Sequence, residues 1–493
     1  GSPYLKHLVI SDTVEVVAGA IISSCANIES VYYGKSVRDP GIGWNTGYNT
    51  HKNFKSLEVS PENAIYYSSG NCIIEKATKT LVRGCGGSVI PDDGSIEVIG
   101  ERAFAFVRGL TELNIPDSVK VIENKAFYYS SYSNSVNTRT FENLVLPSTI
   151  THIGDSAFAT YHTSYPLNLK GELIIPNSVT SIGERAFYYC NKFTSLSFEE
   201  NSNLQTIGDY AFAGYDGSYS TTSMGFTGEL NIPNSVTYIG ERAFRNCESL
   251  KTIVVPSSLT ILSKETFYYC NNLESVDISE GVIEIGRDAF GLCTNLKKVV
   301  IPKSVNIIRE FAFSRCEKLT CVIIPEGVTK IERYAFSSCK KLKKVSLPKN
   351  VEMDNKVFQN CKALADKDGC IIVNNTLFDY CGESQEVTVP VGVIAIDSGA
   401  FAGCDLKSII IPEGITTIEE KTFSECKKLS KVVLPDSLRI IKEDAFCECS
   451  RLTKIVIPKG VTEIGAYAFL TCSRLRKVYL PVPRTVFFAH PSL

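Results

Sequence analysis

The chain has 493 residues, of which 44% are hydrophobic and 21% charged, and its formal net charge is -2. This composition excludes an intrinsically disordered chain, which would be poor in apolar residues and strongly charged. It also lacks the basic excess that nucleic-acid-binding proteins use. No run approaches the ~18 unbroken apolar residues of a membrane helix, so we expect no membrane span. With five histidines in all, the chain has few positions for histidine-based catalysis.

The first elements in chain order are irregular. Residues 5–31 predict a degenerate first coil of a repeat that becomes regular further on, and residues 32–53 form a Gly-, Asn- and Tyr-rich loop that holds the only tryptophan, Trp44. An exposed Trp44 would be a natural anchor for a partner, whereas a buried one would only fix the loop. Residues 64–91 alternate apolar residues around a short polar turn and predict a hairpin insertion.

A phenylalanine then recurs in register along the rest of the chain. Seven of the fourteen gaps between the fifteen aligned phenylalanines are 23 residues, Ala precedes the ring in twelve cases, and Cys follows three residues later in eleven. A fixed period between 20 and 50 residues indicates stacked repeats. The aligned residues are Phe104, Phe127, Phe158, Phe187, Phe212, Phe244, Phe267, Phe290, Phe313, Phe336, Phe358, Phe401, Phe423, Phe446 and Phe469.

Residues 273–295 form one complete unit of the repeat. Val276 and Ile278 are two positions apart, which is the spacing of one face of a strand, and a Pro that ends this strand is found in most units. We interpret the Ala-Phe segment that follows as one turn of α- or 3₁₀-helix. Each unit has an apolar face that it cannot bury alone, so neighbours must stack. The sequence therefore predicts one domain over residues 1–493, an α/β repeat solenoid of mostly parallel strands and short helical turns.

The gaps from Phe127 to Phe158, from Phe158 to Phe187 and from Phe212 to Phe244 exceed 23 residues by 8, 6 and 9. Each excess begins just after the Ala-Phe segment, so loops 128–140, 159–170 and 213–228 leave the same edge of the solenoid. They are rich in Tyr, which gives large contact area at low entropic cost and is typical of binding loops. The alternative is that these aromatic residues only pack the loops onto the solenoid. With Trp44, the candidate ligand-binding residues are Tyr128, Tyr129, Tyr132, Tyr161, His162, Tyr165, Tyr215, Tyr219 and Phe226.

The C-terminal half adds a second hairpin insertion at 362–389 and a predicted cap at 482–493. Charged and aliphatic residues are sorted along it by their position in the repeat. These columns are either solvated surface with high β-propensity or an interaction stripe for an acidic protein or glycan. The basic column contains Lys297, Lys298, Lys343, Lys344, Lys407, Lys431, Lys454 and Lys477, and the outward aliphatic column contains Val145, Ile174, Val254, Val300, Ile323, Ile410, Val433 and Val456. Acidic residues recur three positions before the Phe, as at Asp155 and Asp209.

Residues able to do chemistry follow the repeat and form no separate cluster. Most cysteines belong to one repeat column, where a free Cys acts as a small buried hydrophobe. The sequence contains no Cys-x-x-Cys motif, which is the spacing that would indicate a zinc site. We therefore expect reduced core thiols, no metal and no cofactor. No Gly-x-Ser-x-Gly, His-Glu-x-x-His or phosphate-loop motif is present. The rival enzyme class is a right-handed β-helix acting on polysaccharide, which would need a cluster of acidic or basic residues that breaks the repeat on one face.

The repeat unit reads Leu-x-x-Val-x-Ile-Pro-x-x-Val-x-x-Ile-x-x-x-Ala-Phe-x-x-Cys, and residues 251–272 show it as KTIVVPSSLTILSKETFYYCNN. It resembles the BspA-like leucine-rich repeats of bacterial and protist surface proteins over roughly residues 5–481. The resemblance implies a right-handed solenoid, a secreted or surface-attached protein that binds proteins or host surfaces, and no catalytic residues. The Asn column of the commonest leucine-rich repeats is replaced by Pro here.

We therefore predict a non-catalytic extracellular adhesion module that recognises host or matrix proteins, or cell-surface glycans, through its extended surface and Tyr-rich edge loops. A structural spacer or coat on the cell surface is the first alternative, and a polysaccharide-active β-helix enzyme is the second. We expect a monomer with no nucleic-acid partner. The opening Gly1-Ser2 is typical of a cloning remnant, so we expect a targeting or anchoring segment to be missing from this chain.

Overall fold

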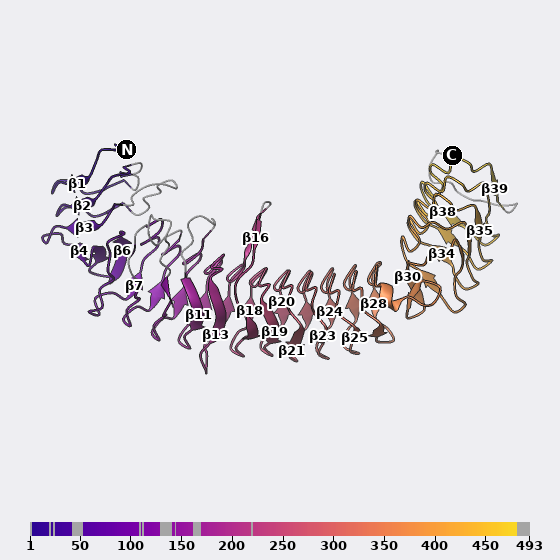
Figure 1. Ribbon diagram of the computed structural model, residues 1–493, viewed down its shortest axis with the longest axis horizontal. Coiled ribbons are helices and arrows are strands. Elements are labelled where there is room, and N and C mark those ends of the chain that lie inside the picture. The colour runs from indigo at the N-terminus through magenta and orange to yellow at the C-terminus, as the bar shows by residue number, and fades with distance from the viewer. Residues whose placement is uncertain are drawn as a thin grey trace. The chain divides into compact units, whose positions relative to one another are not determined.

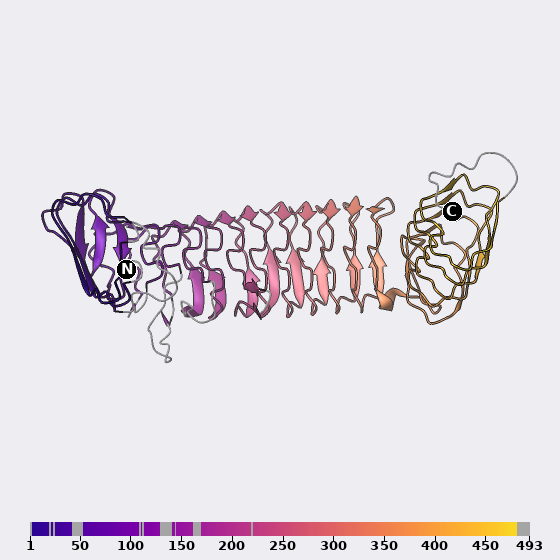
Figure 2. The same ribbon diagram turned by 90° about the horizontal axis from the view of Figure 1, so that it is seen from above.

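The computed structural model describes residues 2–480 except 19–20, 23–24, 42–52, 108–109, 111–112, 129–140, 143, 161–168 and 218–219. The chain divides into two compact units, Gly1–Val282 and Ile283–Leu493. Within each unit the chain winds into stacked coils, and most coils contribute one strand to each of two columns of parallel strands (Figures 1 and 2). We call these columns the broad sheet and the narrow sheet.

The broad sheet is formed by the Val-x-Ile segment of each coil. Its strands pair in parallel register, so that Ile253 of one coil lies opposite Val276 of the next, and both side chains are buried. In the first unit the strands are β9 (Phe141–Glu142), β11 (Leu169–Ile175), β13 (Phe193–Phe198), β17 (Gly228–Asn231), β19 (Leu250–Val255) and β21 (Ser275–Ile278). In the second unit they are β23 (Lys298–Val300), β25 (Cys321–Ile323), β27 (Lys344–Ser346), β31 (Glu386–Thr388), β33 (Ser408–Ile410), β35 (Lys431–Val433), β37 (Lys454–Val456) and β39 (Lys477–Tyr479).

The narrow sheet consists of two-residue strands whose second residue points into the core. Ile153, for example, lies opposite Ile182, and both are buried. In the first unit the strands are β7 (Val98–Ile99), β8 (Val121–Ile122), β10 (His152–Ile153), β12 (Ser181–Ile182), β14 (Thr206–Ile207), β18 (Tyr238–Ile239) and β20 (Ile261–Leu262). In the second they are β22 (Glu284–Ile285), β24 (Ile307–Ile308), β26 (Lys330–Ile331), β28 (Glu352–Met353), β32 (Ala395–Ile396), β34 (Thr417–Ile418), β36 (Ile440–Ile441) and β38 (Glu463–Ile464).

The prediction of a helical turn at the Ala-Phe segment is wrong. A left-handed residue stands two positions before the Phe, as at Arg242 and Phe311, and another commonly stands two positions after it, as at Arg315. A left-handed residue at each end breaks any right-handed helical run, so the fold is a β-solenoid rather than α/β. Among the described residues the only helix is the 3₁₀-helix η1 (Lys362–Leu364). The described residues contain no helix with the length and hydropathy needed to cross a bilayer.

Backbone hydrogen bonds between coils explain why the turns adopt this conformation. The N–H of Phe313 donates to the carbonyl of Ala335 at 2.7 Å, and the N–H of Arg315 donates to the carbonyl of Ser337 at 2.8 Å, each in the next coil. The Ala-Phe turns of successive coils, which we call the turn column, therefore continue the hydrogen bonding of the two sheets. Because an unpaired buried backbone group is costly, these bonds offset the ~1 kcal/mol or more that a left-handed non-glycine residue costs.

The column cysteine ties each turn to the preceding coil. The thiol of Cys339 donates to the carbonyl of Phe313 at 3.3 Å, and the thiol of Cys426 donates to the carbonyl of Phe401 at 3.0 Å. All eighteen cysteines are free thiols, and burial raises the pKa of Cys426 to about 12. The position therefore suits a small buried side chain that is also a hydrogen-bond donor.

The aligned phenylalanines stack inside each unit. In the first unit the rings from Phe104 to Phe267 lie 5.1–5.5 Å apart and nearly parallel. In the second unit the same stacking runs from Phe290 to Phe358 and from Phe401 to Phe469. All of them are fully buried except Phe469 at the end of the stack, which is half-buried. The stack confirms the period of about 23 residues.

A hairpin fills the gap in the second unit's phenylalanine stack. Its strands β29 (Cys370–Val373) and β30 (Thr376–Tyr380) are antiparallel. Phe378 meets Phe358 edge to face at 5.4 Å, and Tyr380 lies 5.3 Å from Phe401. The hairpin thus supplies two rings to the core where the repeat lacks a phenylalanine.

The N-terminal part of the first unit pairs parallel strands with an antiparallel insertion. The parallel strands are β1 (His7–Ile10), β2 (Ser30–Tyr33) and β3 (Ser56–Val59), and the antiparallel strands are β4 (Tyr66–Ser69), β5 (Cys72–Glu75) and β6 (Thr80–Gly84). Gly84, the last residue of β6, packs against the first ring of the stack. A Cβ at this position would lie 2.0 Å from the ring of Phe104. Only glycine leaves room for that ring.

Candidate functional site

The structure describes Tyr128, Tyr215 and Phe226 among the candidate ligand-binding residues. The first two are half-buried where loops leave the coil, and the third is buried. The other candidates lie outside the described residues: Trp44, Tyr129, Tyr132, Tyr161, His162, Tyr165 and Tyr219.

Five tyrosines, which we call the tyrosine edge, form a cluster: Tyr128, Tyr188, Tyr189, Tyr210 and Tyr215. They pack around two buried alanines of the turn column. Tyr188 meets Tyr210 edge to face at 6.2 Å, and Tyr189 lies 5.3 Å from Tyr215. At the described residues, the aromatic side chains that begin the loops therefore pack onto the solenoid. The result is a fixed aromatic base from which the loops leave.

The third loop returns to the core before it ends. Met224 and Phe226 are buried, and the ring of Phe226 lies 6.1 Å from Phe212 and 6.5 Å from Phe193. Phe226 is therefore a core residue with no surface to offer a partner. The part of this loop that projects from the coil is the antiparallel pair β15 (Tyr215–Gly217) and β16 (Ser220–Thr222) (Figure 1).

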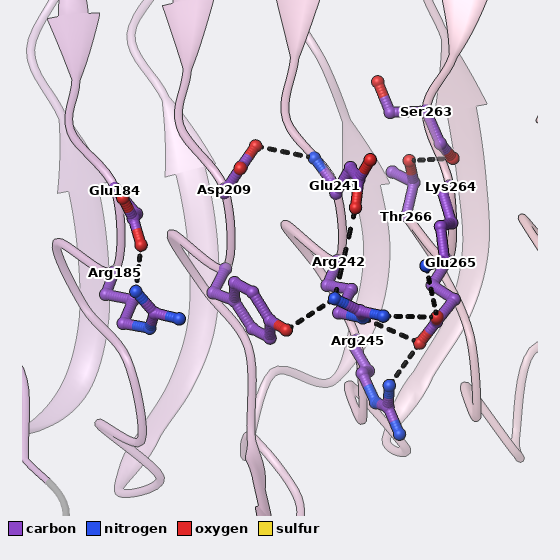
Figure 3. Close-up of polar contacts among 11 residues, drawn as sticks. Glu184, Arg185, Asp209, Glu241, Arg242, Arg245, Ser263, Lys264, Glu265 and Thr266 are labelled. Carbon is purple, nitrogen blue, oxygen red and sulfur yellow. Dashed lines mark hydrogen bonds and ion pairs between the residues drawn. The ribbon is translucent and has the colours of Figure 1, made fainter.

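A charged network lies on the same turns as the tyrosine edge (Figure 3). Arg242 donates to both carboxylate oxygens of Glu265, at 2.9 and 2.7 Å, and to the hydroxyl of Tyr210 at 2.7 Å. Arg245 also pairs with Glu265. The guanidinium of Arg185 lies 4.6 Å from the centre of the Tyr210 ring, and that of Arg242 lies 5.3 Å from it. Cations from the two flanking coils therefore hold Tyr210 in place.

The network keeps Glu265 charged in a largely buried position. Burial alone would raise the pKa of Glu265, but the hydrogen bonds and charges of Arg242 and Arg245 outweigh it and hold the pKa below its usual range. The hydrogen bonds with Glu265 in turn raise the pKa of Arg242 above its usual value. The pair thus stays ionised at neutral pH and fixes one side of the tyrosine edge.

The acidic column three positions before the Phe has a structural use in the first unit. Asp155 Oδ1 accepts the backbone N–H of Glu184 at 2.8 Å, and Asp209 Oδ1 accepts that of Glu241 at 2.8 Å; Figure 3 includes the second bond. Each carboxylate therefore caps the turn of the next coil. These side chains join coils and do not form a free acidic stripe.

The outer face of the broad sheet carries the aliphatic column at the surface. Of its eight residues only Val254 is half-buried, and the others are exposed. The lysine column is exposed alongside it in the second unit. Alternation along the strand accounts for both columns, because the residues on either side of the inward Val point outward. This face is a second candidate surface.

The described residues contain no group of three or more His, Cys, Asp or Glu side chains that could hold a metal ion. A buried carboxylate, Asp397, lies beside the second-unit hairpin. Asp397 accepts the backbone N–H groups of Lys356 and Ser398, and burial raises its pKa to about 6 against the opposing effect of these bonds and of the Lys356 charge. The side chain of Asp397 thus accepts hydrogen bonds from two backbone groups, one in its own coil and one in the preceding coil.

Asp397 should make the second unit less stable as pH rises from about 4 to 6. The folded-state pKa of about 6 exceeds the ordinary value of 3.8, so folding takes up a proton between these values and that contribution is lost above pH 6. Asp397→Asn removes the titration and keeps a carbonyl acceptor. The free energy of unfolding of this variant, measured with urea, should exceed that of the natural chain by about 3 kcal/mol at pH 7 and match it at pH 4. Parallel pH profiles for the two proteins would contradict this expectation.

The comparisons with known proteins agree with this architecture. A family model described as BspA type leucine rich repeat region matches six times, over residues 88–160, 134–224, 164–265, 217–297, 260–368 and 371–488. None of the curated proteins searched has a matching sequence.

Several solved structures are similar to this chain. A leucine-rich repeat protein from Bacteroides ovatus is 25% identical, with 85% of this chain and 87% of that chain covered and a TM-score of 0.44. A leucine rich cell surface protein from Faecalibacterium prausnitzii is 24% identical, with 68% and 84% covered and a TM-score of 0.37. The pneumococcal vaccine antigen PcpA is 16% identical, with 85% and 97% covered and a TM-score of 0.35.

Proposed function

The chain belongs to the BspA-type leucine-rich repeat family, and from that premise we propose that it is a non-catalytic adhesion module that works outside the cell or on its surface. Leucine-rich repeat solenoids generally bind proteins, because stacked coils present a long surface. A preorganised surface also lowers the entropic cost of binding. We propose a host or matrix protein as the partner, and right-handed coils, the sense that the family resemblance implies.

The tyrosine edge is the observation that supports this function most directly. Three loops leave the same phase of the repeat in the first unit, and the residues that begin two of them pack on Tyr188, Tyr189 and Tyr210. Cation contacts and hydrogen bonds fix Tyr210 in turn. Such a base holds the loop ends in place, so that less entropy is lost when the loops contact a partner. We propose that Tyr132, Tyr165 and Tyr219 of these loops make the contacts.

The test is binding to a panel of purified extracellular-matrix proteins, measured by surface plasmon resonance. We expect the natural chain to bind at least one of them. The triple variant Tyr132→Ser, Tyr165→Ser and Tyr219→Ser should weaken that binding about tenfold or more, since interface tyrosines commonly contribute over ~1 kcal/mol each. None of the three positions is an aligned phenylalanine of the repeat, and the thermal midpoint should be unchanged.

The matched control replaces three exposed tyrosines that are not part of the tyrosine edge: Tyr4, Tyr238 and Tyr467. With Ser at each position it loses the same number of tyrosines and should bind as the natural chain does. Equal binding by the loop variant and the natural chain would reject the loops as the contact site. Failure of the natural chain to bind any member of the panel would favour the structural-spacer alternative.

A further inference from the structure

The outer face of the broad sheet between β33 and β39 carries two parallel rows of side chains. Consecutive strands here are neighbours, and their register places Lys454 opposite Lys477 and Ile410 opposite Val433. One row is Lys431, Lys454 and Lys477, all exposed. The other is Ile410, Val433, Val456 and Tyr479, with exposed fractions of 42%, 40%, 60% and 49%. We call this pair of rows the lysine–aliphatic face.

The lysine row differs from several other lysines of the same coils, which have carboxylate partners. Lys428 pairs with Asp405 at 2.8 Å, and Lys442 pairs with Glu419 at 2.6 Å. None of the three row lysines pairs with a carboxylate among the described residues. Like charges on neighbouring strands repel one another. The row therefore favours a partner that brings negative charge, and the adjoining row favours one that also brings apolar surface.

We propose that the lysine–aliphatic face binds an acidic amphipathic α-helix of another protein, laid along the stacking direction. Strands in a sheet repeat every ~4.8 Å, and a helix brings a new side chain to the same face every ~5.4 Å. An extended peptide would do so only every ~6.7 Å, which would place most of its carboxylates out of step with the lysines. The helix presents one row of Glu or Asp to the lysines and one row of Leu or Ile to the aliphatic residues.

Other occupants fit this face less well. A sulfated polysaccharide would satisfy the lysines but would place polar hydroxyls against Val433 and Val456, where they lose hydrogen bonds to water. The chain's own terminal segment, 481–493, contains an arginine and no acidic side chain. The inference uses a surface separate from the tyrosine edge, so either can fail without the other.

The experiment titrates the full chain into a fluorescein-labelled helical peptide of about 20 residues with adjacent rows of Glu and Leu, and records anisotropy. We expect saturable binding. The triple variant Lys431→Glu, Lys454→Glu and Lys477→Glu should weaken it about tenfold or more, since three ion pairs each change the affinity a few-fold. The matched control reverses three other exposed lysines of the same unit, Lys318, Lys341 and Lys349, and should bind as the natural chain does.

A second variant, Val433→Ser with Val456→Ser, separates the helix from a polyanion. It should weaken binding of the peptide several-fold and leave binding of dextran sulfate unchanged. The proposal is overturned if the peptide does not bind, if the control weakens binding as much as the row variant, or if the serine variant binds the peptide as tightly as the natural chain. Circular dichroism confirms that each variant is folded.

Discussion

Phe313→Ala should destabilise the second unit by about 3–5 kcal/mol, the usual cost of removing a buried aromatic side chain from a core. Phe313 is fully buried between Phe290 at 5.3 Å and Phe336 at 5.2 Å, with rings nearly parallel. Its loss opens a cavity and removes two aromatic contacts of about 0.5–1.5 kcal/mol each. Because each coil contacts only its neighbours, the damage should concentrate in the adjoining coils. Urea unfolding followed by far-ultraviolet circular dichroism measures the change.

Phe469→Ala is the matched comparison at the end of the stack. Phe469 is half-buried and stacks on one ring, Phe446, at 5.5 Å. With one stacking neighbour and solvent on part of the ring, the loss should be about 1–2 kcal/mol. Phe313→Leu, which keeps most of the volume, should also cost less than the alanine change. An equal effect of the alanine change at both positions would show that the rings do not support one another as a stack.

The phenylalanine period and the strand alternation were predictable because the core sets both. Every coil must present the same inward side chains to its neighbours, so Phe, Val and Ile recur at fixed spacing and remain visible in a single sequence. The family resemblance rests on these same columns. The match of the family model from residue 88 to 488 agrees with it.

The turn conformation was not predictable from residue types. Left-handed backbone usually selects Gly or Asn, yet Arg242, Glu265 and Phe311 occupy these positions. What fixes the conformation is the hydrogen bond from one turn to the next coil, a contact between residues about 23 positions apart. Local propensity contains no information about such a bond, and Ala-Phe alone looks helical.

The tyrosine edge was predicted only in part. The long gaps in the repeat located the loops, and Tyr128 and Tyr215 lie where two of them begin. Tyr188, Tyr189 and Tyr210 were missed because they stand inside regular coils, at positions next to the aligned phenylalanine that vary from coil to coil. Comparing these positions between adjacent coils, where an Arg or a second Tyr recurs, is the signal that would have found them.

Glu265→Gln should destabilise the first unit by about 2–4 kcal/mol, somewhat less than the loss of one partner from a fully buried ion pair. Gln cannot neutralise Arg242 and Arg245, whose side chains are only 22% and 17% exposed, and two guanidinium groups lose the carboxylate that they share. The variant should also alter the fluorescence of Tyr210, to which Arg242 donates a hydrogen bond. Urea unfolding and tyrosine emission measure the two effects.

The pH dependence of unfolding separates a charge effect from a packing effect at this position. The pKa of Glu265 is lowered by folding, so its contribution is present above the unfolded value of 4.5 and is lost as pH falls through the folded value. The difference in stability between the natural chain and Glu265→Gln should therefore shrink on acidification. Glu317→Gln, which removes an exposed partner of Lys340, should cost below about 1 kcal/mol at any pH. If Glu265→Gln behaves like Glu317→Gln, the network does not hold the tyrosine edge.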